Sequence, residues 1–410
     1  MRPPDQKEIQ AKRLFITRTL AVLVFVLVAM TAILLRLYWL QIQHHDHYKT
    51  LATDNRIKLL PLPPARGEIY DRNGVVLAKN ITSVDLFITP DQVDDIPAVI
   101  AELQEIVTIT EEDIQRFGKL RRRLRRFEQV PIRTGLTDEE MAQFAVERHR
   151  FRGVDLGVNL RRYYPFGELT AHVVGYIGRI NERELERIDK AAYAGTSHIG
   201  KTGLERFYEE QLHGDVGVQR VEIDAMGHII RILETQPPVT GEDIQLHFDI
   251  ELQKIAFEAL GEHAGSVVVI DVKTGGVLAM ASKPSFDANL FVNGISFKDY
   301  NALRDDSGNP LFNRAINGSY PPGSTVKPFI GLAGLETQTV NHVQAIYCPG
   351  HYRIKNAGRT FRDWKRTGHG TIDLEKSIEQ SCDVYYYDLA YSMGIDKMHD
   401  YLAQFHFGKQ

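Results

Sequence analysis

The 410-residue sequence has few cysteines and little net charge. Its only two cysteines, Cys348 and Cys382, exclude a small fold held together by several disulfide bonds. The formal net charge of −4 argues against a protein whose main task is to bind nucleic acid. Hydrophobic residues make up 43% and charged residues 25% of the chain, as in ordinary globular proteins. The length allows two or three domains of about 150 residues each.

Long apolar runs are scarce as well, and the one that stands out lies near the N-terminus. Residues 19–35 contain no charge, are rich in Leu, Val, Ala and Ile, and are bracketed by Arg18 and Arg36. The run is close to the lower limit of about 17 residues for a membrane-spanning helix. No convincing small-x-small cleavage site of a signal peptide follows it. We therefore predict a transmembrane anchor over residues 19–40.

Basic residues before this run predict its orientation. They include Lys7, Lys12, Arg13 and Arg18. Because positively charged flanks stay in the cytoplasm, we expect residues 1–18 to form a cytoplasmic tail and the chain after about Gln41 to lie outside the cytoplasm.

Turn and boundary signals divide the remaining sequence into two regions. Asn73-Gly74 between two apolar runs predicts a β-hairpin, and residues 90–150 have a helical pattern. The segment 236–241 is rich in proline and glycine and predicts a boundary. We assign residues 41–240 to a mixed α/β domain. Short strands and an amphipathic helix are expected towards its end, after Gly200.

The second region begins near residue 243 with the pattern of an α+β domain. Ile244, Leu246 and Phe248 alternate as in a half-buried strand, and Asp249 is a suitable N-cap for a helix that reaches about Glu262. Two apolar strands, 266–271 and 277–282, follow and are joined by a glycine-rich turn.

A serine and a lysine three residues apart form a candidate nucleophilic site. Ser324 follows a Pro-Pro-Gly turn and precedes an apolar run with helical spacing, so Lys327 is expected on the same side of a helix start. A lysine that is partly removed from water can accept the serine proton, and the helix start provides free N–H groups. A second candidate, Ser381-Cys382-Asp383, opens another helical run, where Ser381 could relay a proton and Asp383 orient it. A simple N-capping role is the alternative.

Between these two motifs lie four side chains that could hold a metal ion. Cys348, Asp363, His369 and Cys382 offer two thiolates, an imidazole and a carboxylate, a set suited to structural zinc. Three alternatives remain open: a Cys348–Cys382 disulfide in an oxidising compartment, two unrelated buried thiols, or His369 and Asp363 as ordinary polar groups of a loop.

Several motifs together resemble one known family. The sequence 320–327 resembles the active-site motif of penicillin-binding proteins, which acylate a serine with D-Ala-D-Ala peptides or β-lactams. Other segments resemble the non-catalytic pedestal domain of the class B members: 66–74, 164–165, 172–178 and 203–205. The resemblance implies a membrane anchor, a pedestal over 41–240 and part of a β-lactamase-like serine transpeptidase domain over 243–410.

The same resemblance implies a function and a set of roles. The chain is expected to be a serine-type D-Ala-D-Ala transpeptidase or carboxypeptidase that needs no cofactor. Ser324 would be the acyl nucleophile, Lys327 its base, and Ser381 with Asp383 the second motif. Class B members usually carry asparagine at the third position of that motif. The aspartate here resembles the elongation-type members, which work at the inner membrane with an integral-membrane glycan polymerase and periplasmic scaffold proteins.

Three alternatives to this function remain, and one motif is missing. A division-specific transpeptidase, a non-catalytic activator and a β-lactam sensor are the rivals.

The third family motif, Lys-Thr/Ser-Gly, is expected downstream of Gln410. Neither Lys201-Thr202-Gly203 nor Lys273-Thr274-Gly275 can replace it, since both precede Ser324. We therefore expect the 410 residues alone to lack normal acylation activity.

Overall fold

The computed structural model describes residues 6–44, 56–122, 126–224, 229–354 and 358–408, the side chains of 6–14 excepted. Part of the predicted cytoplasmic tail (1–5) and the segment after the anchor (45–55) lie outside the described residues. The chain divides into two compact units, Met1–Asn317 and Gly318–Gln410. This division falls inside the region 243–410 and not at its start.

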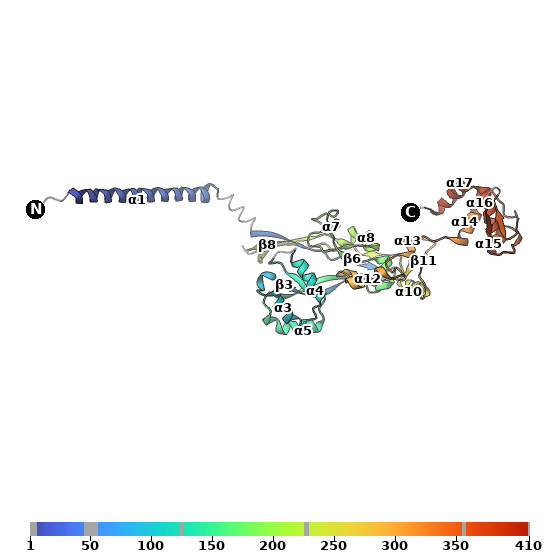
Figure 1. Cartoon of the computed structure of the whole chain (residues 1–410), viewed down its shortest axis with the longest axis horizontal. Helices are drawn as coiled ribbons and strands as arrows, with labels where there is room; N and C mark the ends of the chain where they lie inside the picture. Colours follow the sequence, from blue (N-terminus) through green and yellow to red (C-terminus); the bar gives the residue numbers. More distant parts are fainter. Residues whose placement is uncertain (1–5, 45–55, 123–125, 225–228, 355–357, 409–410) are drawn as a thin grey trace. The chain divides into compact units, whose positions relative to one another are not determined.

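The N-terminal apolar run forms one long helix, α1 (Gln6–Tyr38), which continues as a π-helical turn, η1 (Trp39–Gln43) (Figure 1). Its segment Phe15–Gln43 contains an 18-residue stretch that is strongly apolar and is not covered by the rest of the chain. By length and composition this helix could span a membrane, as predicted. The helix begins well before residue 19, because no helix breaker separates the basic tail from the apolar run.

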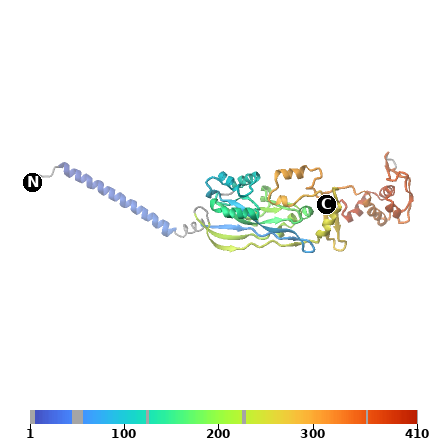
Figure 2. The same ribbon diagram turned by 90° about the horizontal axis from the view of Figure 1, so that it is seen from below.

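Two sheets form the framework of the first unit. The smaller one is antiparallel in the order β1-β8-β9, with Ile57 opposite Glu222 (neighbouring blue and yellow-green strands in Figure 2). The larger one has the order β10-β2-β3-β4, and β5 also pairs with β3. The strands are β1 (Ile57–Leu62), β2 (Ile69–Tyr70), β3 (Val76–Ile88), β4 (Val130–Arg133), β5 (Val154–Tyr163), β8 (Gly217–Ile223), β9 (Ile229–Gln236) and β10 (Ile244–Gln245). The predicted hairpin at Asn73-Gly74 is confirmed: β2 and β3 are antiparallel, and Gly74 has a φ of +83°.

Three helices lie beside β3 and bury a common core: α3 (Ile96–Leu103), α4 (Glu111–Arg121) and α5 (Asp138–Glu147) (Figure 1). The helical pattern of residues 90–150 is thus confirmed, with β4 as an interruption. Capping boxes begin two of these helices, in which Thr110 pairs with Asp113 and Thr137 with Glu140. Phe117, Phe144 and Leu103 are among the side chains that fill the core against the sheet.

Short elements complete the predicted pedestal. They are η2 (Pro90–Gln92), η3 (Arg148–Arg150), η4 (Gly167–Leu169), α6 (Ala171–Val174), β6 (Ile177–Arg179), α7 (Glu182–Leu185), β7 (His198–Gly200), α8 (Gly203–Phe207) and α9 (Glu209–His213). The amphipathic helix expected after Gly200 is therefore a pair of short helices, α8 and α9. The fully buried Glu205 anchors them, since it accepts hydrogen bonds from Arg66 Nε and Arg162 Nε, each at 2.7 Å.

The sequence after residue 243 begins within this same unit. It forms β10, α10 (Ile250–Ala259), β11 (Gly265–Ile270), β12 (Val277–Lys283), α11 (Asn289–Val292), α12 (Phe297–Asp305) and α13 (Arg314–Asn317). The N-cap at Asp249 and the β11–β12 hairpin are confirmed. Two expectations were wrong in extent: the first strand is only two residues long, and the helix ends at Ala259 rather than Glu262.

A buried carboxylate ties the two predicted regions together. Asp71 is fully buried, and its Oδ1 accepts hydrogen bonds from the backbone N–H groups of Asn73 and Val75, each at 2.8 Å. Its Oδ2 accepts one from the N–H of Ile250, the first residue of α10, at 3.2 Å. Leu77 from β3 and Phe248 before α10 belong to one hydrophobic core. The pedestal and the start of the second region therefore fold as one body.

The second unit is a small mixed α/β structure. Its elements are η5 (Gly323–Val326), α14 (Lys327–Glu336), β13 (Ile346–Cys348), β14 (His351–Arg353), β15 (Thr360–Arg362), β16 (Gly370–Ile372), α15 (Leu374–Glu379), α16 (Asp383–Met393), α17 (Ile395–Leu402) and η6 (Ala403–Phe405). Two antiparallel pairs, β13–β16 and β14–β15, flank the helices. A core around Tyr385, Leu389 and Ala333 packs α16 against α14.

Candidate active site

Ser324 lies on a tight turn that leads directly into a helix. Gly323 has a φ of +57°, which a side chain would disfavour, and it begins the 3₁₀ turn η5. The helix α14 starts at Lys327, so the serine and the lysine stand one short turn apart. Ser324 is exposed, whereas Lys327 is only 7% exposed. A nucleophile open to substrate thus lies close to a sheltered amine.

A chain of hydrogen bonds joins the two predicted motifs. The hydroxyl of Ser381 donates to Oγ of Ser324 at 2.8 Å. The ammonium group of Lys327 donates to Oγ of Ser381 at 3.1 Å and to its carbonyl oxygen at 2.8 Å. It also forms an ion pair with Oδ1 of Asp383 at 2.6 Å. All four predicted side chains come together, and the Ser381 hydroxyl lies between the nucleophile and the lysine.

The surroundings of Lys327 explain how its charge is tolerated. A buried ammonium group needs a counter-charge, and the partly exposed carboxylate of Asp383 provides it. The ring of Tyr386 lies 5.6 Å from Nζ and adds a favourable cation–π contact. Asp383 itself is held by the backbone N–H of Trp364 at 3.3 Å.

Ser381 reaches the site through an unusual backbone conformation. Its φ is +53°, in the left-handed region, where a residue with a side chain loses roughly 1–2 kcal/mol. The chain turns there from α15 into α16, and the N-cap of α16 is Cys382, whose sulfur accepts from the N–H of Tyr385. The alternative that Ser381 or Asp383 caps this helix is therefore wrong, which leaves both side chains free to face Lys327.

The four candidate metal ligands also come together. Cys348 ends β13, Asp363 follows β15, His369 precedes β16 and Cys382 caps α16. Their ligand atoms all lie within 4.8 Å of one another. Nδ1 of His369 is 3.5 Å from the sulfur of Cys348 and 3.6 Å from Oδ1 of Asp363. Both cysteines are free thiols, not a disulfide. Burial raises the pKa of Cys382 to about 12, so this thiol stays protonated at neutral pH unless a cation replaces its proton.

Asp363 links the cysteine cluster to the nucleophile. Its Oδ2 accepts hydrogen bonds from the N–H groups of Asp383 at 2.9 Å and Val384 at 3.2 Å. The same carboxylate therefore borders the candidate metal site and positions the residue that pairs with Lys327. The sequence predicts Asp363 only as a metal ligand. This second role, and the roles of Trp364 and Tyr386, could not be predicted, because no local pattern shows contacts between distant segments.

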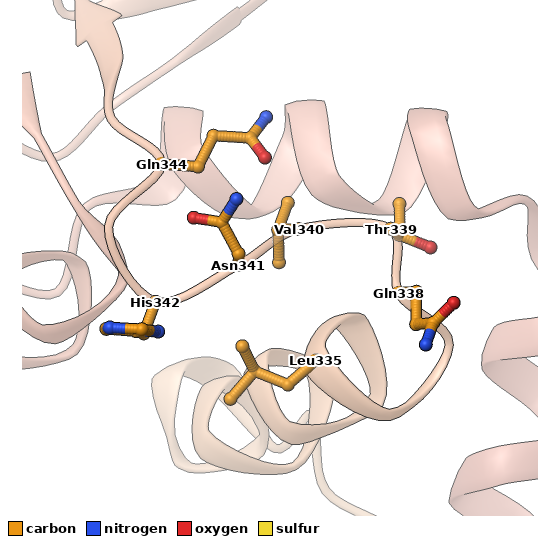
Figure 3. A pocket seen from close by; sticks show the side chains of 7 residues that line it. All are labelled: Leu335, Gln338, Thr339, Val340, Asn341, His342 and Gln344. Atoms are coloured by element: carbon orange, nitrogen blue, oxygen red, sulfur yellow. The ribbon is translucent and has the colours of Figure 1, made fainter.

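A separate hollow of about 280 Å³ lies at the end of α14. Figure 3 shows Leu335 on the helix, and Gln338, Val340, Asn341 and His342 on the loop that follows it. None of the residues of the two clusters lines it, so we assign no part of the chemistry to it.

Two family models match the chain in succession. The penicillin-binding protein dimerisation domain matches residues 61–246, and the penicillin-binding protein transpeptidase domain matches residues 265–410. Together they cover most of the sequence that follows the N-terminal helix. The chain belongs to the penicillin-binding proteins, and this order of domains places it in class B, as the sequence motifs predicted.

The chain is similar to the peptidoglycan D,D-transpeptidase MrdA of two bacteria. It is 44% identical to that of Acinetobacter baumannii over 98% of this chain and 60% of the relative. It is 42% identical to that of Escherichia coli K12 over 96% of this chain and 63% of the relative. The chain thus spans about 60% of the length of these curated relatives.

Solved structures of PBP2 give the same result. PBP2 of Pseudomonas aeruginosa, in complex with WCK 5153, matches with a TM-score of 0.62 and 38% identity, over 86% of this chain and 57% of the other. PBP2 of Helicobacter pylori, in complex with MreC, matches with a TM-score of 0.73 and 30% identity, over 86% of this chain and 66% of the other.

Proposed function

We propose that the chain is part of a peptidoglycan D,D-transpeptidase that cross-links stem peptides during cell elongation. The observation that carries this proposal is the hydrogen-bonded series Ser324–Ser381–Lys327–Asp383. The similarity to MrdA favours elongation over division.

The proposed reaction has two acyl-transfer steps. Oγ of Ser324 attacks the carbonyl carbon of the D-Ala-D-Ala bond, forms an ester, and releases the terminal D-alanine as the C–N bond breaks. The amine of a second stem peptide then attacks the ester, forms the cross-linking amide, and regenerates the serine. A β-lactam would acylate the same oxygen, but its ring-opened ester is slow to react further.

The geometry suggests how the proton moves. Ser381 contacts Ser324 directly, so we propose that it passes the serine proton to Lys327, which acts as the general base in its neutral amine form. The ammonium group formed in this step then returns a proton through Ser381 to the departing amine. Asp383 would keep Lys327 in place beside Ser381. Proton transfer by positioned side chains of this kind contributes about 10²–10⁴-fold to a rate.

The proposal is tested with the full-length protein and a pentapeptide that ends in D-Ala-D-Ala, together with an acceptor peptide. We expect release of D-alanine and formation of the cross-linked product, both abolished by prior treatment with a β-lactam. The enzymatic function would be contradicted if the protein released no D-alanine and formed no β-lactam adduct at Ser324.

We further propose a location and partners. The α1 helix would anchor the protein in the inner membrane with its N-terminus in the cytoplasm and residues after about 41 in the periplasm. Residues 41–240 would form the pedestal and 243–410 part of the transpeptidase domain. PBP2 of Helicobacter pylori forms a complex with MreC, which supports a scaffold partner, and a membrane glycan polymerase would be the second.

The cysteine cluster is proposed to hold a structural zinc ion. Two sulfurs, an imidazole nitrogen and a carboxylate are the ligand types of tetrahedral zinc sites, and all four side chains are buried here. Nε2 of His369 is buried as well, whereas its Nδ1 faces Cys348. A zinc ion would tie the loops around β14 and β15 to the start of α16.

Metal analysis checks this. We expect about one equivalent of zinc in the full-length protein, and a loss of that zinc in Cys348→Ser. Structural zinc contributes several kcal/mol to folding, so its removal should lower the Tm by more than about 5 °C. The exposed His351→Ala variant is the matched control and should keep its zinc. A protein without zinc in which neither cysteine reacts as a free thiol would contradict the proposal and favour the disulfide.

A further inference from the structure

A second cavity lies in the first unit, far along the sequence from Ser324. It has a volume of about 470 Å³ and is bordered by strands β3 and β5 and by the segment before β7. Sites for small organic ligands commonly begin at about 300 Å³. Part of its wall is apolar and open to solvent, because Val158 is 70% and Leu160 58% exposed.

The charged side chains around this cavity are unequal in number. Four guanidinium groups line it, those of Arg66, Arg161, Arg162 and Arg179, whereas Asp85 is the one carboxylate among the described lining residues. Asp85 is already engaged, since it accepts hydrogen bonds from three neutral donors: the hydroxyl of Ser83, the N–H of Gly135 and the side-chain amide of Asn159. The cavity therefore has an excess of positive charge.

Two of these arginines have a counter-charge behind the wall. Arg66 pairs with Glu205 and Glu209, and Arg162 pairs with Glu205 at 2.7 Å. Arg162 as a whole is only 3% exposed, and its Nη2 is buried without a hydrogen-bond partner. A buried guanidinium donor without an acceptor costs free energy, and an oxyanion would satisfy it.

Arg161 forms no ion pair within the described part of the chain, although Asp85 acts on it electrostatically. Its guanidinium group contacts the side-chain oxygen of Asn293 at 2.7 Å, in the amide orientation that satisfies both groups. Burial lowers the pKa of Arg161, and Arg133 adds to this against the opposing effect of Asp85. Burial and the neighbouring Arg179 also lower the pKa of His198 to about 4, so this lining imidazole is neutral at physiological pH. The contributions of Arg133 and Arg179 to these shifts agree with the excess of positive charge around the cavity.

We propose that this cavity binds a small organic oxyanion, a carboxylate or a phosphate, that Arg161 and Arg162 hold. The apolar part of the ligand would lie against Val158 and Leu160. Guanidinium groups bind both kinds of anion in a planar, bidentate manner. The residues that line this cavity do not include Ser324, so the proposed ligand is not the peptide that acylates the serine.

Binding to the full-length protein is measured by isothermal titration calorimetry with three probes: N-acetyl-D-alanine, methyl phosphate and the uncharged N-acetyl-D-alaninamide. We expect at least one of the two anions to bind saturably and the amide to bind far more weakly. Arg161→Gln should weaken anion binding by at least about tenfold, the usual effect of removing a charge-assisted hydrogen bond. The exposed Arg152→Gln variant is the matched control and should bind as the unchanged protein does.

The outcomes separate the alternatives. Binding of the carboxylate alone or of the phosphate alone identifies the ligand class, and either result supports the site. Absence of saturable binding, equal binding of the amide, or unchanged binding in Arg161→Gln overturns it. Labelling of Ser324 by a β-lactam in the same samples reports on the proposed transpeptidase separately, since Arg161 has no part in that chemistry.

Discussion

Replacing Ser324 by alanine is expected to abolish covalent labelling of the full-length protein by a fluorescent penicillin. The hydroxyl oxygen is the atom that would form the acyl bond, and the neighbouring Ser381 hydroxyl lies 2.8 Å away from it. Removing a nucleophile of this kind costs about 10⁶-fold in turnover. Gel fluorescence and mass spectrometry of the adduct measure the loss.

The control for this substitution is Ser319→Ala, an exposed serine a few residues earlier in the same loop. It should label at the unchanged rate. Circular dichroism of both variants establishes that they are folded. An adduct that persists in Ser324→Ala, or one that maps to another residue, would show that the nucleophile has been assigned wrongly.

Replacing Lys327 by alanine is expected to slow acylation by about 10³-fold, within the range of a general base. It should also destabilise the protein by about 2 kcal/mol, because Asp383 loses its buried partner while remaining partly open to solvent. Stopped-flow labelling gives the rate, and the denaturation midpoint gives the stability. Lys376→Ala, an exposed lysine on α15, should change neither.

A double variant separates the two effects. Lys327→Met with Asp383→Asn removes both charges, so most of the lost stability should return while the acylation rate stays low. A double variant that recovers the rate as well would mean that Lys327 serves only to balance the charge of Asp383.

Local sequence patterns were sufficient for much of the fold. The apolar helix, the β2–β3 hairpin and the N-cap at Asp249 each depend on residues that are close in sequence, so composition and spacing predicted them. The strand at residue 244 was predicted too long. Its extent is set by pairing with β2, about 175 residues earlier, and alternation of side chains does not reveal where a partner strand ends.

The candidate site divides in the same way. Ser324 and Lys327 are three residues apart at a predicted helix start, so their proximity could be predicted from the sequence. Their link through Ser381 spans 57 residues, and only the folded chain shows it. The family resemblance supplied the roles of Ser381 and Asp383, whereas the bonds from Asp363 to the start of α16 had no counterpart in any motif.

The buried Asp71 restricts how this chain could be recombined with a homologue. A junction at residue 243 would take β10 and the first turn of α10 from one parent, and their partners in β2 and the Asp71 turn from the other. Gly67 adds to the restriction, because a methyl group there would lie 2.0 Å from the carbonyl oxygen of Glu242. Exchange between related genes is therefore disfavoured at residue 243, because the two parents would have to supply matching partners for β2, β10 and Asp71.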